Sequence, residues 1–356
     1  MTRQLASIRT LTNIQPIPKA DRVELAHIDG WRSVIPKNQF TIGEQILFLE
    51  TDCAILNVND PRFDFLKKSC YKSWTYQGRV IAECLRIKTI KMANQISQGV
   101  VLKLADFQNE LTQINSITAL LNIQHYDDLL DNLKYIMGTS EQSKALSSFP
   151  SFIPKTDEER IQNLPKYLDG RFATLHFEAT VKLDGSSMTV GYSPTYYPND
   201  PYFVCSRNLR LYDDNTQTPT VARNLNLKNI LKTIHEQTGN ELCLQGELIG
   251  PGINNNNDKQ TTHSFNVFRI WNITTSSWLS TQDRYNLCLD NNIPHVPIYL
   301  HDCTILDGLT TIEQLIQQTD MKTPNGNPIE GLVFKSLCGT IHFKVINPQY
   351  LLKNDN

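Results

Sequence analysis

The sequence predicts an α+β protein in which a β-rich N-terminal module precedes a domain of antiparallel sheets with helices. Residues 1–111 hold short β-like runs separated by turn residues, with no long helical pattern between them. From residue 151 onward, β-like runs are mixed with helical patterns. The chain of 356 residues is long enough for two modules that each bury their own core.

The composition excludes several broad classes of protein. With 20% charged and 40% hydrophobic residues, the chain is expected to be globular rather than disordered. No apolar run approaches the ~18 residues of a membrane span, and the N-terminus lacks the apolar stretch of a secretory signal. The eight cysteines form no Cys-x-x-Cys pair, which argues against structural zinc and against a disulfide framework. We therefore expect reduced thiols and a cytoplasmic or otherwise intracellular location.

The small net charge of −2 conceals an asymmetry along the chain. Residues 1–110 carry 15 Lys/Arg against 11 Asp/Glu, or +4, whereas residues 111–150 carry −2 and residues 151–356 carry −4. The positive charge of residues 1–110 is compatible with a nucleic-acid partner, and equally with a chance excess of basic residues.

The N-terminal module fits a small β-barrel of the OB type. Asp29-Gly30 lies between two β-rich runs and predicts a hairpin turn, and further turn signals lie at 16–18 and 59–61. Strands are expected at 5–13, 23–28, 31–35, 44–49, 80–90 and 97–102. The composition leaves another kind of compact β-module open.

The pattern changes in residues 112–150, where we expect one or two helices followed by a linker rich in Ser, Gly and Pro. Apolar residues recur there at mixed helical spacings: Ile117, Leu120, Leu121, Ile123, Leu129, Leu130, Leu133 and Ile136. The expected division is 1–111 for the OB-type module, 112–150 for a helical linker and 151–356 for the second domain. The asparagine run at 254–257 is expected to form an exposed, mobile loop.

The clearest element of the second domain is a strand over 173–184. Its odd positions are apolar and its even positions are polar, among them Glu178, Lys182 and Asp184, so one face is expected to be buried. A turn at 185–187 allows 188–192 to return as the antiparallel partner. A helix is expected over 222–237, and strands over 241–249, 264–271, 331–336 and 340–346.

Lys182 lies in Lys-Leu-Asp-Gly at the end of this strand and is a candidate nucleophile. A lone lysine on the polar face of a strand is more often a solvated charge. Neutralising an amine with a pKa of ~10.4 near neutral pH costs about 4 kcal/mol, and nearby cations lower that cost. We expect later segments to supply such cations. Charged residues lie in four of them: Ser206-Arg-Asn208, Gly246-Glu-Leu-Ile-Gly250, Glu330-Gly-Leu-Val-Phe-Lys335 and Ile341-His-Phe-Lys344.

The order of these segments resembles a family signature. Together with Lys182-Leu-Asp-Gly185 and Phe265-Asn-Val-Phe268, they are similar to motifs I, Ia, III, IIIa, IV and V of the covalent nucleotidyltransferase superfamily. That superfamily comprises ATP-dependent DNA and RNA ligases and mRNA-capping enzymes. DNA ligases and capping enzymes carry their OB module after these motifs, whereas the β-rich module comes first here. This order resembles the Naegleria-type RNA ligases over almost the whole chain.

The resemblance implies an adenylyltransferase (ATP-grasp-like ligase) domain after the OB module, and an ATP-dependent RNA ligase activity. In such enzymes a lysine attacks the α-phosphate of ATP and retains AMP, which then moves to a 5′-phosphate. A 3′-hydroxyl attacks the activated phosphate, and the strand is sealed as AMP leaves. The implied substrate is a nicked RNA or RNA/DNA duplex, and the implied metal is Mg²⁺ or Mn²⁺.

The resemblance also implies roles for individual residues. Lys182 is the nucleophile, Lys344 contacts the α-phosphate, and Glu330 and Asp184 join the metal network. The remaining residues are implied in binding ATP or AMP: Glu247 on a ribose hydroxyl, Phe265 stacked on adenine, Arg207 on ribose or an end phosphate, Arg160 on a phosphate, and Lys335 and His342 beside them. An ordinary core position is the alternative for Phe265.

Two positions depart from the family pattern. Val181 stands where many relatives have Glu before the lysine, and His342 replaces the first lysine of motif V. The remaining alternatives are a DNA ligase, a capping guanylyltransferase, and a catalytically dead ligase-fold protein that binds nucleic-acid ends. Four intact residues argue against the dead protein: Lys182, Glu247, Glu330 and Lys344. An RNA-binding OB module fused to an unrelated α+β domain is a further alternative, which leaves the ordered motifs unexplained. We expect a monomer with no membrane partner.

Overall fold

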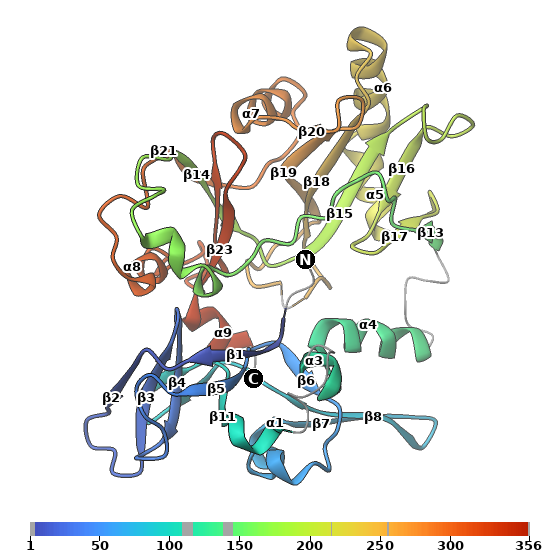
Figure 1. Cartoon of the computed structure of the whole chain (residues 1–356). Coiled ribbons are helices and arrows are strands. Elements are labelled where there is room, and N and C mark those ends of the chain that lie inside the picture. The colour runs from blue at the N-terminus through green and yellow to red at the C-terminus, as the bar shows by residue number, and fades with distance from the viewer. Residues whose placement is uncertain (1–3, 109–116, 138–144, 215, 255, 355–356) are drawn as a thin grey trace. The chain divides into compact units, whose positions relative to one another are not determined.

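The computed structural model describes residues 4–108, 117–137, 145–214, 216–254 and 256–354 (Figure 1). The chain divides into two compact units, Met1–Glu141 with Leu351–Asn356, and Gln142–Tyr350. Within the described ranges, no helix is both long and apolar enough to cross a membrane. All eight cysteines are free thiols.

The first unit consists mainly of short antiparallel strands. They form four sheets with the strand orders β1-β5-β11, β2-β3-β4, β9-β10 and β12-β6-β8-β7. The strands are β1 (Ala6–Thr10), β2 (Asn13–Pro16), β3 (Val23–Ile28), β4 (Trp31–Pro36), β5 (Gln45–Leu49), β6 (Cys53–Ile55), β7 (Tyr71–Tyr76), β8 (Arg79–Arg86), β9 (Ile90–Met92), β10 (Gln95–Ser97), β11 (Val100–Lys103) and β12 (Ile123–His125). Short helices lie at Pro61–Leu66, Lys67–Cys70 (α1) and Leu104–Phe107.

Each of the six strand runs expected in this module contains a strand. The hairpin turn at Asp29-Gly30 is confirmed, because Ile28 pairs with Trp31 and Asp29 has a left-handed φ of 51°. The expectations omit β6, β7 and β12, and they reach only one residue each of β2, β9 and β10. Both faces of β7 are partly exposed, so its sequence lacks the apolar alternation of a half-buried strand.

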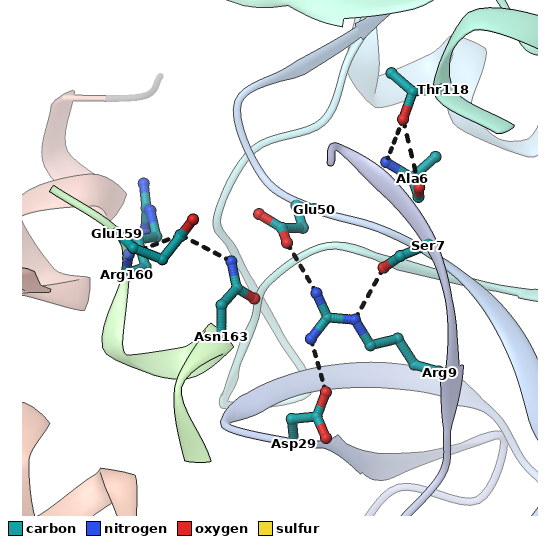
Figure 2. Close-up of polar contacts among 9 residues, drawn as sticks. All are labelled: Ala6, Ser7, Arg9, Asp29, Glu50, Thr118, Glu159, Arg160 and Asn163. Carbon is teal, nitrogen blue, oxygen red and sulfur yellow. Dashed lines mark hydrogen bonds and ion pairs between the residues drawn. The ribbon is translucent and has the colours of Figure 1, made fainter. Parts of the chain in front are cut away.

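Polar contacts tie distant segments of the first unit together, as Figure 2 shows. Arg9 on β1 pairs with Asp29 at 2.7 Å and with the buried Glu50 at 3.1 Å. The Thr118 hydroxyl oxygen accepts a hydrogen bond from the backbone N–H of Ala6 at 3.2 Å. These contacts fix β1 against the β3–β4 turn and against residue 118.

Part of the expected helical linker packs within the first unit. It contains α3 (Ile117–Leu120) and α4 (Tyr126–Ile136), with β12 between them. Leu129 and Leu133 of α4 join a buried cluster with Ala54 of β6 and Cys84 of β8. Residues 138–144 lie outside the described residues. The boundaries 1–111, 112–150 and 151–356 stay a prediction beside the two compact units.

The second unit contains two antiparallel sheets with helices against them. The larger sheet has the strand order β13-β17-β16-β15-β18-β19-β20, and the smaller has the order β21-β14-β22-β23. The strands are β13 (Ala145–Ser148), β14 (Phe177–Lys182), β15 (Ser186–Tyr192), β16 (Tyr202–Cys205), β17 (Leu209–Leu211), β18 (Leu242–Ile249), β19 (Ser264–Asn272), β20 (Ser277–Trp278), β21 (Ile298–Cys303), β22 (Gly331–Ser336) and β23 (His342–Ile346). The helices are α5 (Gln217–Asn224), α6 (Leu227–Thr238), α7 (Thr281–Asp290) and α8 (Ile312–Gln317), with short 3₁₀ turns at Ile161–Asn163 and Pro165–Leu168. The last helix, α9 (Pro348–Asn354), begins in this unit, and its residues from Leu351 onward belong to the first.

Apolar helix faces cover these sheets. Leu227 and Leu231 of α6 are buried in the core of the larger sheet, while Lys232 and Glu236 form an exposed ion pair on the opposite face. Leu315 of α8 is buried in the core of the smaller sheet. In Figure 1, the two sheets of this unit are joined through the short connection from β14 to β15.

The strand expected over 173–184 is shorter than its alternation suggests, and the expectation of one buried face is wrong. β14 begins at Phe177, and both of its faces are buried over residues 177–180. The polar side chain of Glu178 is covered because Arg284 of α7 pairs with it at 2.6 Å, both side chains being 3% exposed. A long-range ion pair therefore buries a face that the local pattern assigns to solvent.

The expected antiparallel pairing of β14 with residues 188–192 is also wrong. β14 pairs with β21 and β22, whereas β15 pairs with β16 and β18 in the other sheet. At Gly185 an added Cβ would lie 2.4 Å from the Leu248 carbonyl oxygen. The missing side chain lets the chain pass close to β18 and change sheets here.

Two further expectations need correction. The helix expected over 222–237 is divided into α5 and α6 by Asn226, whose φ of 54° interrupts the helix. The run 254–257 is not exposed throughout, because Asn257 is 5% exposed and its Nδ2 donates to the Pro328 carbonyl at 3.0 Å. Residue 255 lies outside the described residues.

Candidate active site

Strand pairing in the smaller sheet brings Lys182 and Glu330 together. Lys182 ends β14 and pairs with Gly331, the first residue of β22, so Glu330 lies just before the paired segment. The Lys182 Nζ lies 2.7 Å from the Glu330 Oε1. The two side chains are 28% and 17% exposed, which leaves the amine accessible. A charge-assisted hydrogen bond therefore holds the predicted nucleophile at the end of β14.

Two more carboxylates surround this pair. Glu247 lies on β18, where it pairs with Ser187 of β15, and Asp184 follows Lys182 by two residues. Burial raises the pKa of Glu247 to about 7, with Glu330 and Asp184 adding to the rise and Lys182 opposing it. Burial likewise raises the pKa of Glu330. The site is thus an acidic cluster with one lysine in it.

The expectation that cations surround Lys182 and lower its pKa is wrong for the described residues. Burial alone favours the neutral amine, but the negative charges of Glu330, Glu247 and Asp184 outweigh it and raise the pKa of Lys182. The amine is therefore charged at neutral pH in this state. A cation bound among the carboxylates would offset their negative charge and lower the pKa of Lys182.

Asp184 has one oxygen available for such a species. Its Oδ1 accepts a hydrogen bond from the Asn254 Nδ2 at 3.0 Å, and its buried Oδ2 has no hydrogen-bond partner. No group of three His, Cys, Asp or Glu side chains among the described residues forms a ready metal site. Carboxylate oxygens such as the Asp184 Oδ2 are the ligands that the hard divalent cations Mg²⁺ and Mn²⁺ prefer.

Asn254 is a site residue that the sequence analysis missed. Its Nδ2 donates to the Asp184 Oδ1 and to the Gly185 carbonyl at 2.6 Å, so it orients the Asp184 carboxylate. The sequence offered only an asparagine run, which predicts a loop without indicating what the loop holds.

Substituting Asn254 tests this orienting contact. We expect Asn254→Ala to weaken Mn²⁺ binding by about tenfold, because hydrogen-bond partners that orient a metal ligand commonly contribute ~10–100-fold to affinity. Water-proton relaxation measures this binding without any turnover. Asn256→Ala is a matched control, since Asn256 has the same φ of 43° and donates instead to the Gln260 carbonyl. Equal Mn²⁺ affinities of the two variants would contradict the assignment.

Lys344 and Arg160 lie beside the cluster. Lys344 of β23 pairs with Val333 of β22, and its charge acts on Glu330 by opposing the rise of the Glu330 pKa. Arg160 forms an isolated parallel bridge with Lys344 and is 5% exposed. Figure 2 shows the neighbouring Glu159, whose side chain accepts hydrogen bonds from the Arg160 N–H and from the Asn163 amide. The charge of Lys344 thus acts on Glu330, and the backbone of Arg160 lies beside that of Lys344.

Arg207 lies at the edge of the site. It follows β16, is 45% exposed and lies 3.4 Å from the Asp157 carboxylate. Its positive charge opposes the rise of the Glu247 pKa that burial causes. An exposed ion pair of this length contributes little to stability, so the guanidinium remains available to an anionic ligand.

Lys335 and His342 belong to a second, more buried charge cluster. In the register of β14 and β22, Lys335 lies opposite Glu178. Glu178 precedes Lys182 by four residues on β14, a separation of ~13 Å along the strand. The Lys335 Nζ donates to the Phe268 carbonyl at 2.9 Å, and burial lowers its pKa to about 7 against the opposing charge of Glu158. His342 hydrogen-bonds Glu158. The predicted ATP contacts of Lys335 and His342 stay predictions.

The two phenylalanines of the segment 265–268 differ in exposure. Phe265 is fully buried in the core of the larger sheet, so its ring has no free face there. Phe268 is half-buried and is the extra residue of a β-bulge, since Gly246 pairs with Val267 and Gln245 pairs with Arg269. Its ring packs beside Val181 and Leu183. Adenine stacking on Phe265 stays a prediction, and Phe268 is the more accessible ring.

Comparisons with known proteins bear on both units. Residues 5–104 match a family model described as an OB-fold domain, and residues 175–346 match the family model described as RNA ligase. A search of curated proteins found no match.

Solved structures of an RNA ligase from Naegleria gruberi match the whole chain. A variant with ATP and Mn is 32% identical, with a TM-score of 0.83, covering 99% of this chain and 100% of that one. The enzyme with PPi is 33% identical, with a TM-score of 0.82 and 99% coverage of each chain. Another variant, with AMP and Mn, has the same identity, TM-score and coverage. The expected fold class, an OB-type module followed by a ligase domain, is confirmed.

Proposed function

The chain belongs to the RNA ligase family and is an ATP-dependent RNA ligase, and from this premise we propose that it seals 3′-hydroxyl and 5′-phosphate ends at nicks in duplexes through a lysyl-AMP intermediate. The observation that carries the proposal is the position of the Lys182 amine, 2.7 Å from Glu330 within a cluster that also contains Asp184 and Glu247.

In the first step, Lys182 attacks ATP. The Lys182 Nζ loses a proton, for which the Glu330 carboxylate at 2.7 Å is the acceptor. The neutral amine attacks the α-phosphorus and releases a second proton to solvent, the bond to the bridging oxygen breaks, and pyrophosphate leaves with the electron pair. Lys344 and Arg160 supply positive charge to the phosphoryl oxygens, where negative charge is concentrated.

In the next two steps, AMP activates one end and leaves. An oxygen of the RNA 5′-phosphate attacks the lysyl-AMP phosphorus, the P–N bond breaks, and Lys182 recovers its proton. The 3′-hydroxyl then attacks the activated 5′-phosphate, a phosphodiester forms, and AMP departs. Lys182 is a nucleophile only in the first step, whereas cationic side chains are useful in all three.

Asp184 and Glu330 would hold Mg²⁺ or Mn²⁺. When bound, the metal supplies positive charge that offsets the carboxylates, favours the neutral amine and stabilises charge on the phosphate. The orphaned Oδ2 of Asp184 is the observation that fits this ion. Solved structures of the Naegleria gruberi ligase with Mn support the same ion here.

We propose that the nucleoside binds against Glu247 of β18 and the segment 265–268 of β19. Glu247 would accept a hydrogen bond from a ribose hydroxyl, and Arg207 would contact ribose or an end phosphate. Phe265, or the more accessible Phe268, would stack on adenine. Lys335 and His342 would act on ATP from the second charge cluster.

The first unit is proposed to help bind the nucleic acid. Its OB-fold match and the +4 charge of residues 1–110 support this role. Of its aromatic residues, Tyr71 is 43% exposed, whereas Trp31 is fully buried and Trp74 packs on Tyr126. Tyr71 is therefore better placed than either tryptophan to meet a base.

Two assays on the full chain test the proposal. Incubation with ATP labelled at the α-phosphate and Mn²⁺ or Mg²⁺ should leave an acid-labile label on the protein. Nicked RNA and RNA/DNA duplexes with a 5′-phosphate should then be sealed. Labelling by GTP instead of ATP would support a capping enzyme, and sealing of DNA nicks alone would support a DNA ligase. A folded, AMP-free protein that takes no label and seals nothing would overturn the proposal.

A further inference from the structure

A pocket of about 490 Å³ lies on the second unit beside the proposed active site. One wall is α5, through Thr220, Val221 and Asn224, and the other is the segment 262–264, where β19 begins. Pockets of ~300–1,000 Å³ commonly bind small molecules or single groups of larger ones. The proposed chemistry at Lys182 leaves this pocket without a role.

The lining surface is mostly apolar and carries no formal charge when the imidazole is neutral. Val221 and Leu225 line the pocket together with side-chain amides, hydroxyls and one imidazole. Arg223, the nearest cation on α5, is engaged with Asp213 and with the Asp214 carbonyl. A phosphate would therefore find no dedicated cation in the lining, whereas a flat heterocycle with donors and acceptors on its edge matches it.

A short loop connects this pocket to the active site. The His263 Nε2 lies 2.7 Å from the Pro251 carbonyl oxygen, and Gln217 contacts His263. Three residues after Pro251, Asn254 holds Asp184 and Gly185. The same loop thus contacts His263 of the pocket lining and orients the Asp184 carboxylate.

Strand register gives the spacing between the two sites. Ser264 lines the pocket and pairs with Ile249, while Asn266 pairs with Glu247. Two residues of strand span ~7 Å. The pocket therefore begins about one nucleotide length from Glu247, within reach of a base next to the reacting phosphate.

The close approach of His263 requires a glycine on the loop. At Gly250, where φ is +143°, an added Cβ would lie 2.6 Å from the His263 Cδ2. Any side chain there would displace His263 from the pocket wall. His263 of the pocket lining therefore packs directly against the loop that begins at Gly250.

We propose that this pocket binds one unpaired or splayed nucleobase of the RNA substrate adjacent to the nick, with the Asn224 amide contacting the base edge. This inference rests on the proposed ligase function and adds a substrate contact to it. Binding a base here would position the reacting ends without affecting the reaction of Lys182 with ATP.

Single-turnover sealing of nicked duplexes with a pre-adenylated 5′-phosphate tests the proposal. An abasic nucleotide is placed in turn at each of the three positions on either side of the nick. For the wild-type chain, we expect one position to slow sealing by about tenfold, the effect of losing one or two hydrogen bonds and a packed ring. Asn224→Phe, which fills the pocket, should slow sealing of the intact substrate by a similar factor and make that abasic position neutral.

Controls separate this proposal from the ligase assignment. Asn224→Phe should self-adenylate with ATP at the wild-type rate, which also verifies folding, and Gln237→Phe on the exposed face of α6 should leave sealing unchanged. Asn224→Ala provides a smaller change should the phenylalanine variant misfold. Abasic effects that are identical in wild-type and Asn224 variants, or loss of self-adenylation by a folded Asn224→Phe protein, would overturn the proposal. Failure of the wild-type chain to self-adenylate would overturn the ligase proposal itself.

Discussion

Lys182→Met is expected to reduce self-adenylation by more than about 1,000-fold, because methionine has a similar length but no nucleophilic nitrogen. The predicted effect is confined to the first step. Sealing of a nick with a pre-adenylated 5′-phosphate should persist, since that step uses the 3′-hydroxyl as nucleophile. Labelled ATP and pre-adenylated RNA measure the two steps separately.

The exposed ion pair of α6 supplies a matched control. Lys232 lies 3.6 Å from Glu236 and is 54% exposed, so Lys232→Met also removes one lysine from an ion pair. This variant should retain label at the wild-type level. Label that survives Lys182→Met on a different residue would assign the nucleophile elsewhere, and equal loss of both steps would indicate a damaged site rather than a missing nucleophile.

Glu330→Gln should give the second largest effect, a loss of self-adenylation of about 100-fold at saturating ATP. The substitution keeps the shape of the side chain and removes the negative charge 2.7 Å from the Lys182 Nζ. The pKa of Lys182 should fall, because Glu330 helps to raise it. The amine then deprotonates more readily, but the proton acceptor and a proposed metal contact are both lost.

A Mn²⁺ titration separates these contributions. If Glu330 contacts the metal, Glu330→Gln should require at least about tenfold more Mn²⁺ for half-maximal labelling. Glu236→Gln removes the carboxylate of the exposed pair and should change neither the rate nor the Mn²⁺ requirement. Wild-type labelling by Glu330→Gln at low Mn²⁺ would show that Glu330 has no part in the first step.

Local patterns predicted most of the strands that form the site. β22 occupies the range expected for it, and β18, β19 and β23 begin or end within two residues of their expected bounds. Alternation of apolar and polar residues is a property of a single strand, so it can be recognised without knowing the partner. The same alternation misled at Glu178, because its burial depends on Arg284, more than one hundred residues later in the chain.

For Lys182 as well, the sequence identified the residue but not its electrostatic environment. Its place in Lys-Leu-Asp-Gly and the order of the later segments identified the candidate nucleophile and the family. The direction of its pKa did not follow, since the carboxylates of Glu330, Glu247 and Asp184 surround it in place of the expected cations and outweigh the effect of burial. Electrostatic effects depend on distances in space, which spacing along the chain does not supply.

The sequence by itself determined which chemical groups the chain carries, the order of its motifs and the existence of most of its strands. Only the tertiary structure decided that β14 and β15 enter different sheets, that Asn254 holds Asp184, and that Phe268 rather than Phe265 exposes its ring. The reason is physical. Periodicity and turn chemistry act between neighbours in the chain, whereas burial, strand partners and charge environment are set by residues that meet only after folding.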